Sequence, residues 1–119
     1  MNIEQAEVWL VEFSPQRGSE IAKRRPAIVV SHNSVGRLPL KTIVPITDWK
    51  ERYNGYPWML PLDSNASNGL TKRSAIDCFQ IKNLSDERFV RKLGKIEAEL
   101  LRKIHQTIAK TLNPVYALQ

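Results

Sequence analysis

The sequence predicts a mainly β protein, a small barrel of short strands with one helix packed against it near the C-terminus. Three observations lead to this fold class. Five or six apolar segments of strand length alternate with turns rich in proline and glycine. One segment, residues 97–112, has the apolar spacing of a long helix. The 119 residues, 42% of them hydrophobic, suffice for one modest core. We therefore expect a single domain over residues 1–119.

The first two predicted strands flank a polar loop at residues 14–20. Residues 7–13 are rich in aromatic and β-branched side chains, which favours a strand. Residues 27–30 contain no polar side chain and are too short for a helix, so we expect a strand buried on both faces. Pro26 cannot donate a ladder hydrogen bond, which predicts the first position of this strand or an edge. It also favours an extended backbone at Arg25.

The middle of the chain predicts three more extended segments. They are residues 42–47, 56–62 and 74–81. Pro45 lies inside the first of these and predicts an edge strand or a bulge. Residues 48–55 form a polar segment, which we expect to be a mobile connection.

The remaining elements lead into the helix. Asn68-Gly69 ends a turn cluster and favours positive φ. Residues 84–88 resemble one helical turn capped by serine. Residues 89–96 predict a short last strand. One apolar helix face is predicted from Leu100, Leu101, Ile104, Ile108 and Leu112. Glu97 and Glu99 complement the helix dipole in the first turn, and Asn113-Pro114 ends the helix.

Charge and composition narrow the class of partner. The net charge of +6 predicts an anionic partner, first of all nucleic acid, although a solvated basic surface is the alternative. Cys78 is the single cysteine, which excludes an internal disulfide and a cysteine metal cluster. No apolar run is long enough for a membrane span, and the N-terminus does not resemble a signal peptide. We expect a cytoplasmic protein that does not bind a membrane.

Arg25 is the first candidate for a functional residue. It stands on stiff backbone at the mouth of the buried strand, where a fixed guanidinium suits phosphate or carboxylate recognition. The structural alternative is an ion pair with Glu20.

Several motifs in order resemble the MazF/PemK family of endoribonuclease toxins from bacterial toxin–antitoxin pairs. The match covers residues 7–112, although no single motif is diagnostic. Its motifs are Glu7-Val8-Trp9-Leu10-Val11, Ser14-Pro15 with Gly18-Ser19-Glu20, Arg25-Pro26-Ala27-Ile28-Val29-Val30-Ser31, Val44-Pro45-Ile46-Thr47, Gly55-Tyr56-Pro57, Asn68-Gly69-Leu70 and Gln80-Ile81.

The resemblance implies an SH3-like barrel of the CcdB/PemK type that forms a homodimer. It also implies metal-independent cleavage of single-stranded RNA at short preferred sequences, with no cofactor, and an acidic antitoxin that blocks the RNA groove. The family's catalytic residues correspond to Arg25, Thr47 and Glu20 in this sequence. Many relatives carry aspartate where this chain has Phe79, and Asp77 would project from the same strand face two residues earlier.

The predicted RNA contacts surround these three residues. They are Ser19, Lys23, Arg24, Asn33, Lys72, Arg73 and Gln80. The cations would contact phosphates, whereas the two amides would read base edges. His32 could make a minor RNA contact, whereas His105 is expected to be a surface or packing residue. No His, Cys or carboxylate grouping has metal-ligand spacing. A second set of candidates could stack on unpaired bases or belong to the core or a dimer interface: Trp49, Tyr53, Tyr56 and Trp58.

The expected chemistry uses the RNA's own 2′-hydroxyl as nucleophile and leaves a 2′,3′-cyclic phosphate and a 5′-hydroxyl. Arg25 and Thr47 would stabilise the charge on the phosphorane. A guanidinium is a poor base, so Glu20 is left either to remove the proton or to orient Arg25. Two alternatives stay open, namely a CcdB-like toxin that poisons DNA gyrase through its C-terminal helix and a non-catalytic RNA-binding barrel.

Overall fold

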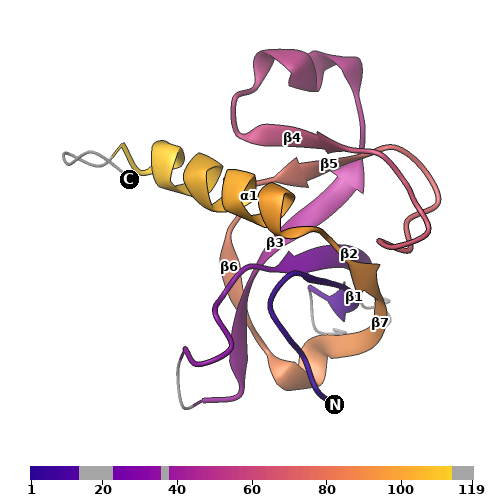
Figure 1. Ribbon diagram of the computed structural model, residues 1–119, viewed down its shortest axis with the longest axis vertical. Helices are drawn as coiled ribbons and strands as arrows, with labels where there is room; N and C mark the ends of the chain where they lie inside the picture. Colours follow the sequence, from indigo (N-terminus) through magenta and orange to yellow (C-terminus); the bar gives the residue numbers. More distant parts are fainter. Residues whose placement is uncertain (14–22, 36–37, 114–119) are drawn as a thin grey trace.

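The computed structural model describes residues 1–13, 23–35 and 38–113, and this part of the chain forms an antiparallel sheet with one α-helix (Figure 1). The strands are β1 (Glu7–Glu12), β2 (Arg24–Val29), β3 (Leu40–Asp48), β4 (Met59–Leu62), β5 (Ser74–Asp77), β6 (Lys82–Ser85) and β7 (Phe89–Lys95). The helices are the 3₁₀ helices η1 (Glu51–Gly55) and η2 (Asp86–Arg88) and the α-helix α1 (Ala98–Thr111). The prediction of a mainly β fold with a C-terminal helix is confirmed.

The strands follow the order β4-β5-β3-β2-β1-β7, and β6 pairs with β3 beside that path. The long strand β3 joins the two halves of the sheet. Its residues 40–43 pair with β6, residues 43–45 with β2 on the other side, and residues 46–48 with β5. Figure 1 shows β1, β2, β6 and β7 curled together below α1, while β4 and β5 lie above it. We call the curled part, with the first half of β3, the barrel.

Two apolar clusters cover the two faces of the sheet. One lies inside the barrel and includes Trp9, Val11, Ala27, Val29, Ile43, Leu84 and Phe89. The other packs against α1 and includes Val8, Ile28, Val44, Ile46, Ile76, Ile104 and Ile108. Consecutive strand residues point to opposite faces, so β2 contributes to both clusters. The prediction that residues 27–30 are buried on both faces is confirmed, since all four are buried.

Helix α1 forms within the predicted span and buries the predicted apolar face at its centre. Ile104 and Ile108 are buried, and Leu100 and Leu101 pack against the same cluster. Leu112 is 74% exposed, so its assignment to this face was wrong; it lies just beyond the last helical residue. The ring Nε2 of His105 lies 2.8 Å from the Val30 carbonyl oxygen, a contact that ties the helix to the end of β2.

Pro26 lies third in β2, an inner strand, so its predicted place at a strand start or an edge was wrong. The Phe13 N–H donates to the Lys23 carbonyl at 2.9 Å, and hydrogen-bonded pairs recur at every second position of an antiparallel ladder. The Leu10–Pro26 pair is therefore a non-bonded one, and the Pro26 nitrogen points toward β3. The β2–β3 pairing ends one residue away, at Ala27–Pro45.

Pro45 also lies within an inner strand rather than at an edge. By the same alternation its nitrogen faces away from β2, toward the side where β6 and β5 pair. On that side the β6 pairing ends at Ile43 and the β5 pairing begins at Ile46. Pro45 occupies the gap, where no ladder donor is needed.

The region after β5 departs most from the prediction. The expected strand 74–81 ends at Asp77, because the Asp77 carboxylate accepts the Phe79 N–H and closes a turn. The chain re-enters the sheet as β6, which the sequence analysis missed. The predicted helical turn at 84–88 covers the end of β6 and η2, and Ser85 makes no side-chain cap hydrogen bond.

Two further segments have defined structure. The expected mobile connection at 48–55 contains η1. Gly69 has the positive φ that the turn predicts, at 69°, whereas Asn68 does not and instead buries its side chain. Its Oδ1 accepts hydrogen bonds from the backbone N–H groups of Asn65 and Leu70.

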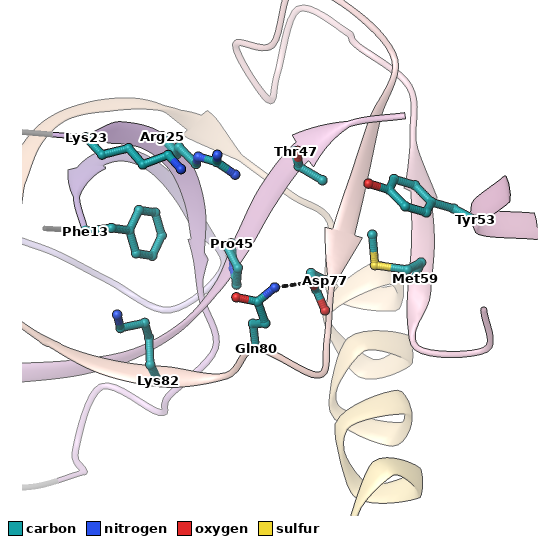
Figure 2. A pocket seen from close by; sticks show the side chains of 10 residues that line it. All are labelled: Phe13, Lys23, Arg25, Pro45, Thr47, Tyr53, Met59, Asp77, Gln80 and Lys82. Carbon is teal, nitrogen blue, oxygen red and sulfur yellow. Dashed lines mark hydrogen bonds between the residues drawn. The ribbon is translucent and has the colours of Figure 1, made fainter. Parts of the chain in front are cut away.

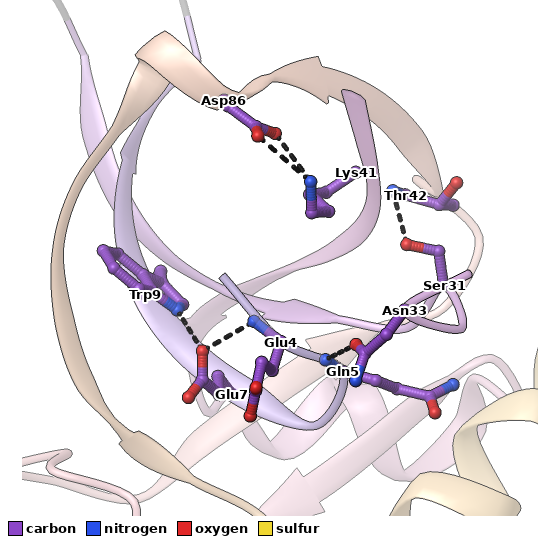
Figure 3. Close-up of polar contacts among 9 residues, drawn as sticks. All are labelled: Glu4, Gln5, Glu7, Trp9, Ser31, Asn33, Lys41, Thr42 and Asp86. Carbon is purple, nitrogen blue, oxygen red and sulfur yellow. Dashed lines mark hydrogen bonds and ion pairs between the residues drawn. The ribbon is translucent and has the colours of Figure 1, made fainter. Parts of the chain in front are cut away.

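A buried carboxylate anchors the N-terminal segment (Figure 3). Glu7 Oε1 accepts hydrogen bonds from the Glu4 N–H at 2.8 Å and from Trp9 Nε1 at 3.0 Å, and Oε2 lies 2.7 Å from Lys92 Nζ. Burial alone would raise the pKa of Glu7, but these hydrogen bonds and the charge of Lys92 outweigh it, so the pKa lies below its ordinary value.

Candidate functional site

The open end of the barrel forms a groove of about 340 Å³ (Figure 2). We call it the barrel-mouth groove. Its lining residues are Phe13, Lys23, Arg25, Pro45, Thr47, Tyr53, Met59, Asp77, Gln80 and Lys82.

Strand alternation explains why these side chains meet. Residues two apart on a strand share a face, so Phe13 continues the inward row of Trp9 and Val11 beyond the end of β1. In the same way, Lys82 lies two residues before the inward Leu84 on β6. The apolar interior of the barrel therefore gives way to polar and charged side chains at its mouth.

Arg25 and Thr47 reach the groove from neighbouring strands. Arg25 lies two positions before Ala27 and Thr47 two positions after Pro45, and Ala27 and Pro45 are the last β2–β3 pair. Both side chains therefore point to the barrel side of the sheet. The two strands part here, where Pro26 has no N–H to donate to β3. Figure 2 shows the Arg25 guanidinium extending from β2 toward the Thr47 side of the groove. Two of the three predicted catalytic residues thus line one groove.

The groove carries an excess of positive charge. Lys23, Arg25 and Lys82 line it, against a single lining carboxylate among the described residues, Asp77. Figure 2 shows Lys82 on the side opposite Lys23 and Arg25. The Lys82 ammonium lies 5.3 Å from the Phe13 ring centroid, within range of a cation–π contact. A concave, cationic mouth of this kind attracts phosphate groups.

Asp77 and Gln80 are joined within the groove. Gln80 Nε2 donates to Asp77 Oδ2 at 2.8 Å, and the Phe79 N–H donates to Oδ1 at 3.1 Å (Figure 2). The expectation that Asp77 and Phe79 project from one strand face was wrong, since the strand ends at Asp77. Asp77 lines the groove, whereas the Phe79 side chain is 66% exposed beside it.

Three of the predicted phosphate contacts engage carboxylates outside the groove lining. Arg24 Nη2 lies 2.8 Å from Glu12 Oε1, since the Arg24 side chain faces the side opposite Arg25. Lys72 lies 3.0 Å from Asp48, and Arg73 lies 3.3 Å from Asp63. Such exposed pairs are weak, so they do not exclude these cations from binding an anion.

Asn33 is not brought to the groove. Because β2 runs away from the groove, the residues that follow it, including His32, lie at its far end. Asn33 Oδ1 accepts the Gln5 N–H at 2.7 Å (Figure 3), and His32 Nδ1 contacts Ser34 Oγ at 2.7 Å. Ser19 and Glu20 lie outside the described residues.

Phe13 and Lys82 are groove residues that the sequence analysis did not select. The period of two finds Phe13 one residue past the end of β1 and Lys82 at the first position of β6, but the second needs the register of β6, which was not recognised.

Other chemical groups in the described residues lie elsewhere. Cys78 is buried, and burial, with a smaller effect from Asp77, raises its pKa to about 12, so it remains a protonated thiol. Within residues 1–13, 23–35 and 38–113, no three His, Cys, Asp or Glu side chains gather closely enough to hold a metal ion. None of the helices described here is long and apolar enough to span a membrane.

Comparison with known sequences shows what the chain resembles. Residues 4–112 match a family model described as PemK-like, MazF-like toxin of type II toxin–antitoxin system. The endoribonuclease MazF9 of Mycobacterium tuberculosis is 30% identical over 108 residues, which cover 86% of this chain and 89% of that protein.

Solved structures show the same fold. MazF from Deinococcus radiodurans matches with a TM-score of 0.70 and 24% identity, over 94% of this chain and 97% of that one. An endoribonuclease from a mycobacterial species, solved in complex with its cognate antitoxin, matches with a TM-score of 0.73 and 16% identity, over 98% and 100% of the two chains.

Proposed function

The chain belongs to the PemK/MazF family of toxins of type II toxin–antitoxin systems, and from this premise we propose that it is an endoribonuclease that cleaves single-stranded RNA, mainly messenger RNA, in the barrel-mouth groove. One observation supports this location above the others. Arg25 and Thr47 point into the same cationic groove from two strands that part beside them.

The groove suits a reaction in which negative charge grows on phosphorus. The 2′ oxygen loses its proton and attacks the adjacent phosphorus, the bond to the 5′ oxygen breaks, and that oxygen keeps the electron pair and takes a proton from water. The products are a 2′,3′-cyclic phosphate and a 5′-hydroxyl. Arg25 binds two phosphoryl oxygens with its forked guanidinium, and Thr47 donates its hydroxyl to the same centre. Lys23 and Lys82 hold the flanking phosphates.

Proton removal needs a different group, because a guanidinium stays protonated. We assign this task to Glu20, the carboxylate that the family resemblance implies. Asp77 has another role, since its two oxygens already accept hydrogen bonds from Phe79 and Gln80. It fixes the Gln80 amide at the groove, where the amide oxygen reads a base edge.

Two binding partners are proposed, an antitoxin and a second copy of the chain. We propose an acidic antitoxin that covers the groove, since the chain carries a net charge of +6 and MazF from Deinococcus radiodurans was solved together with MazE. We also propose that the toxin acts as a homodimer. Co-purification from the native operon and light scattering of the free toxin test these two proposals.

The activity is tested with purified protein and a long RNA in EDTA, followed by sequencing of the new 5′ ends. Wild-type protein should cut at a short recurring sequence, and Arg25→Ala should lower the rate at least about a hundredfold, the scale seen when one transition-state donor is removed. Arg25→Lys keeps the charge without the fork and should recover little. The matched control is Arg102→Ala, since Arg102 pairs with Glu99 on the exposed face of α1.

The outcome also separates the alternatives. Intact RNA with inhibited gyrase would favour a CcdB-like poison. RNA binding with no product would favour a non-catalytic barrel. Full activity in Arg25→Ala would place the reaction elsewhere.

A further inference from the structure

Five aromatic side chains form a continuous row, and one of them, Tyr53, lines the barrel-mouth groove. Successive ring centroids lie 5.8, 5.8, 5.0 and 6.2 Å apart. In order, the rings are Trp49, Tyr53, Tyr56, Trp58 and Phe79. The row therefore runs from the end of β3, through η1 and the start of β4, to the turn between β5 and β6.

The row meets the groove at Tyr53, and its Phe79 end lies close in the chain to two groove residues. Tyr53 lines the groove itself (Figure 2). Phe79 lies between Asp77 and Gln80 along the chain, near their joined side chains. A strand of RNA held at Arg25 and Thr47 would therefore meet these rings on leaving the groove.

The rings are not part of either apolar core. None of the five belongs to the clusters described for the sheet faces. Phe79 is 66% exposed and Tyr56 is 37% exposed, while Trp49, Tyr53 and Trp58 are half-buried. A contiguous aromatic row that is at least partly exposed marks a binding site more often than an isolated exposed side chain does.

The row is also held in place before any ligand arrives. The Tyr53 N–H donates to the Lys50 carbonyl at 2.9 Å, and the Tyr56 N–H donates to the Tyr53 carbonyl at 3.0 Å. The Cys78 N–H donates to the Trp58 carbonyl at 3.0 Å, which ties β4 to the turn that carries Phe79. Tyr56 and Trp58 stack with their planes 10° apart, and the Trp58 and Phe79 rings are in contact with their planes 56° apart.

We propose that this row, with Phe79 at its exposed end, is a stacking platform for an unpaired base next to the cleaved phosphate. The inference deepens the proposed function and rests on it. A phenyl ring offers a π face and no hydrogen bonds, so it orders a base without regard to its identity. Gln80, one residue further, is then left to select the base by its edge.

The charges beside the row favour nucleic acid over a second copy of this basic chain. The Arg52 guanidinium carbon lies 5.4 Å from the Tyr53 ring centroid, and that of Arg73 lies 4.8 Å from the Trp49 ring centroid. A strand with bases on the rings would bring its phosphates near these cations. Two copies of the chain would bring these arginines together, and Glu51, which accepts a hydrogen bond from Trp49 Nε1 at 3.2 Å, would offset only part of their charge.

The test measures the coupling between one base and one ring. The probe is a short single-stranded 2′-O-methyl RNA that spans the mapped cleavage site, since methylation blocks the attacking hydroxyl. A series of such probes carries a single abasic position moved along the sequence. With wild-type protein, one position should lower affinity about tenfold or more, the effect of losing one stacked base.

Phe79→Ala should lower the affinity for the intact probe to a similar extent. In this variant, the abasic position that mattered in wild type should no longer lower the affinity. Phe79→Tyr keeps the aromatic face and should behave as wild type, whereas Phe79→Leu keeps apolar volume and should behave as Ala. Leu38→Ala is the matched control, since Leu38 is 69% exposed and lies outside the groove and the row. Leu38→Ala should change neither quantity.

The outcomes separate the inference from the function on which it rests. If each abasic position lowers the affinity by the same factor in wild type and in Phe79→Ala, the platform is disproved. RNA cleavage that depends on Arg25 would still stand. If wild-type protein neither cuts nor binds RNA, the proposed function fails and the platform fails with it.

Discussion

Pro26 on β2 and Ile46 on β3 lie one position beyond the last pair that joins their strands, Ala27 with Pro45. An N–H at position 26 would point at β3, and the next pair of the ladder would be 26 with 46. The missing donor thus ends the pairing at the point where Arg25 and Thr47 enter the groove. One proline both stiffens the backbone before Ala27 and opens the site.

Pro26→Ala should therefore close the groove. The new N–H can donate to Ile46, which extends the β2–β3 ladder and draws Arg25 toward Thr47. Misplacing a catalytic group by about 1 Å costs up to about a hundredfold, so kcat/KM for RNA should fall between about tenfold and a hundredfold. Stability should change little, because the new hydrogen bond offsets the loss of a rigid residue.

Hydrogen exchange checks the cause, since the amide at position 26 should be protected. Pro61→Ala is the control, because Pro61 is exposed on β4 at the edge of the sheet. A protected amide at position 26 together with undiminished cleavage would show that the strand separation is unimportant.

Thr47→Val should reduce cleavage by about ten- to a hundredfold, because valine keeps the shape of threonine and removes its donor. Thr47→Ser should keep most of the activity. If the loss lies in the transition state, kcat should fall while RNA affinity stays constant. Thr71→Val in an exposed turn serves as the comparison. Equal rates for Thr47→Val and wild type would remove Thr47 from the mechanism.

Lys82→Ala should weaken RNA binding uniformly across sequences and make it less dependent on salt. Each phosphate contact on a single strand contributes about 0.7 to the slope of log affinity against log salt. The slope should become shallower by about that amount, as measured by fluorescence anisotropy with a 2′-O-methyl probe. Lys110→Ala, on the distant C-terminal part of α1, should leave the slope unchanged. A loss of affinity with an unaltered slope would mean that Lys82 does not meet a phosphate.

Local patterns predicted the strands whose signals are strong. Residues 27–30 and the centre of the helix are buried as their apolar spacing indicates. The residue order that resembles the family also brought Arg25 and Thr47 forward, and both line the groove.

The rest depends on pairing between distant segments. Residues 82–85 form a strand because β3 offers them an edge, although Lys-Asn-Leu-Ser has little strand character of its own. Without that register, the inward direction of Lys82 cannot be found. The destination of Asn33 is likewise set by the direction in which β2 runs, which places it at the end away from Arg25.

Glu7 should make stability depend on pH in the acid range. Its pKa in the folded protein lies below the ordinary value of a glutamate, so the unfolded chain binds a proton more readily. The stabilisation is therefore complete above the unfolded pKa and is lost as pH falls through the folded pKa. Glu7→Gln keeps the size of the side chain but cannot titrate, so its free energy of unfolding should fall less steeply over this range. Urea denaturation between about pH 3 and pH 7 measures the difference.

Glu7 is one of many carboxylates in the chain, so the comparison needs a matched variant. Glu99→Gln removes one exposed carboxylate that pairs with Arg102 on α1, and side-chain exposure there is 75% against 9% at Glu7. Its pH profile should follow wild type, because a solvated pair changes little on folding. Only the Glu7 variant should differ in slope: its curve should run parallel to the other two above the unfolded pKa of glutamate and fall less steeply than they do at lower pH. Parallel curves for all three proteins would mean that the contacts with Lys92, Glu4 and Trp9 do not outweigh the cost of burying the Glu7 carboxylate.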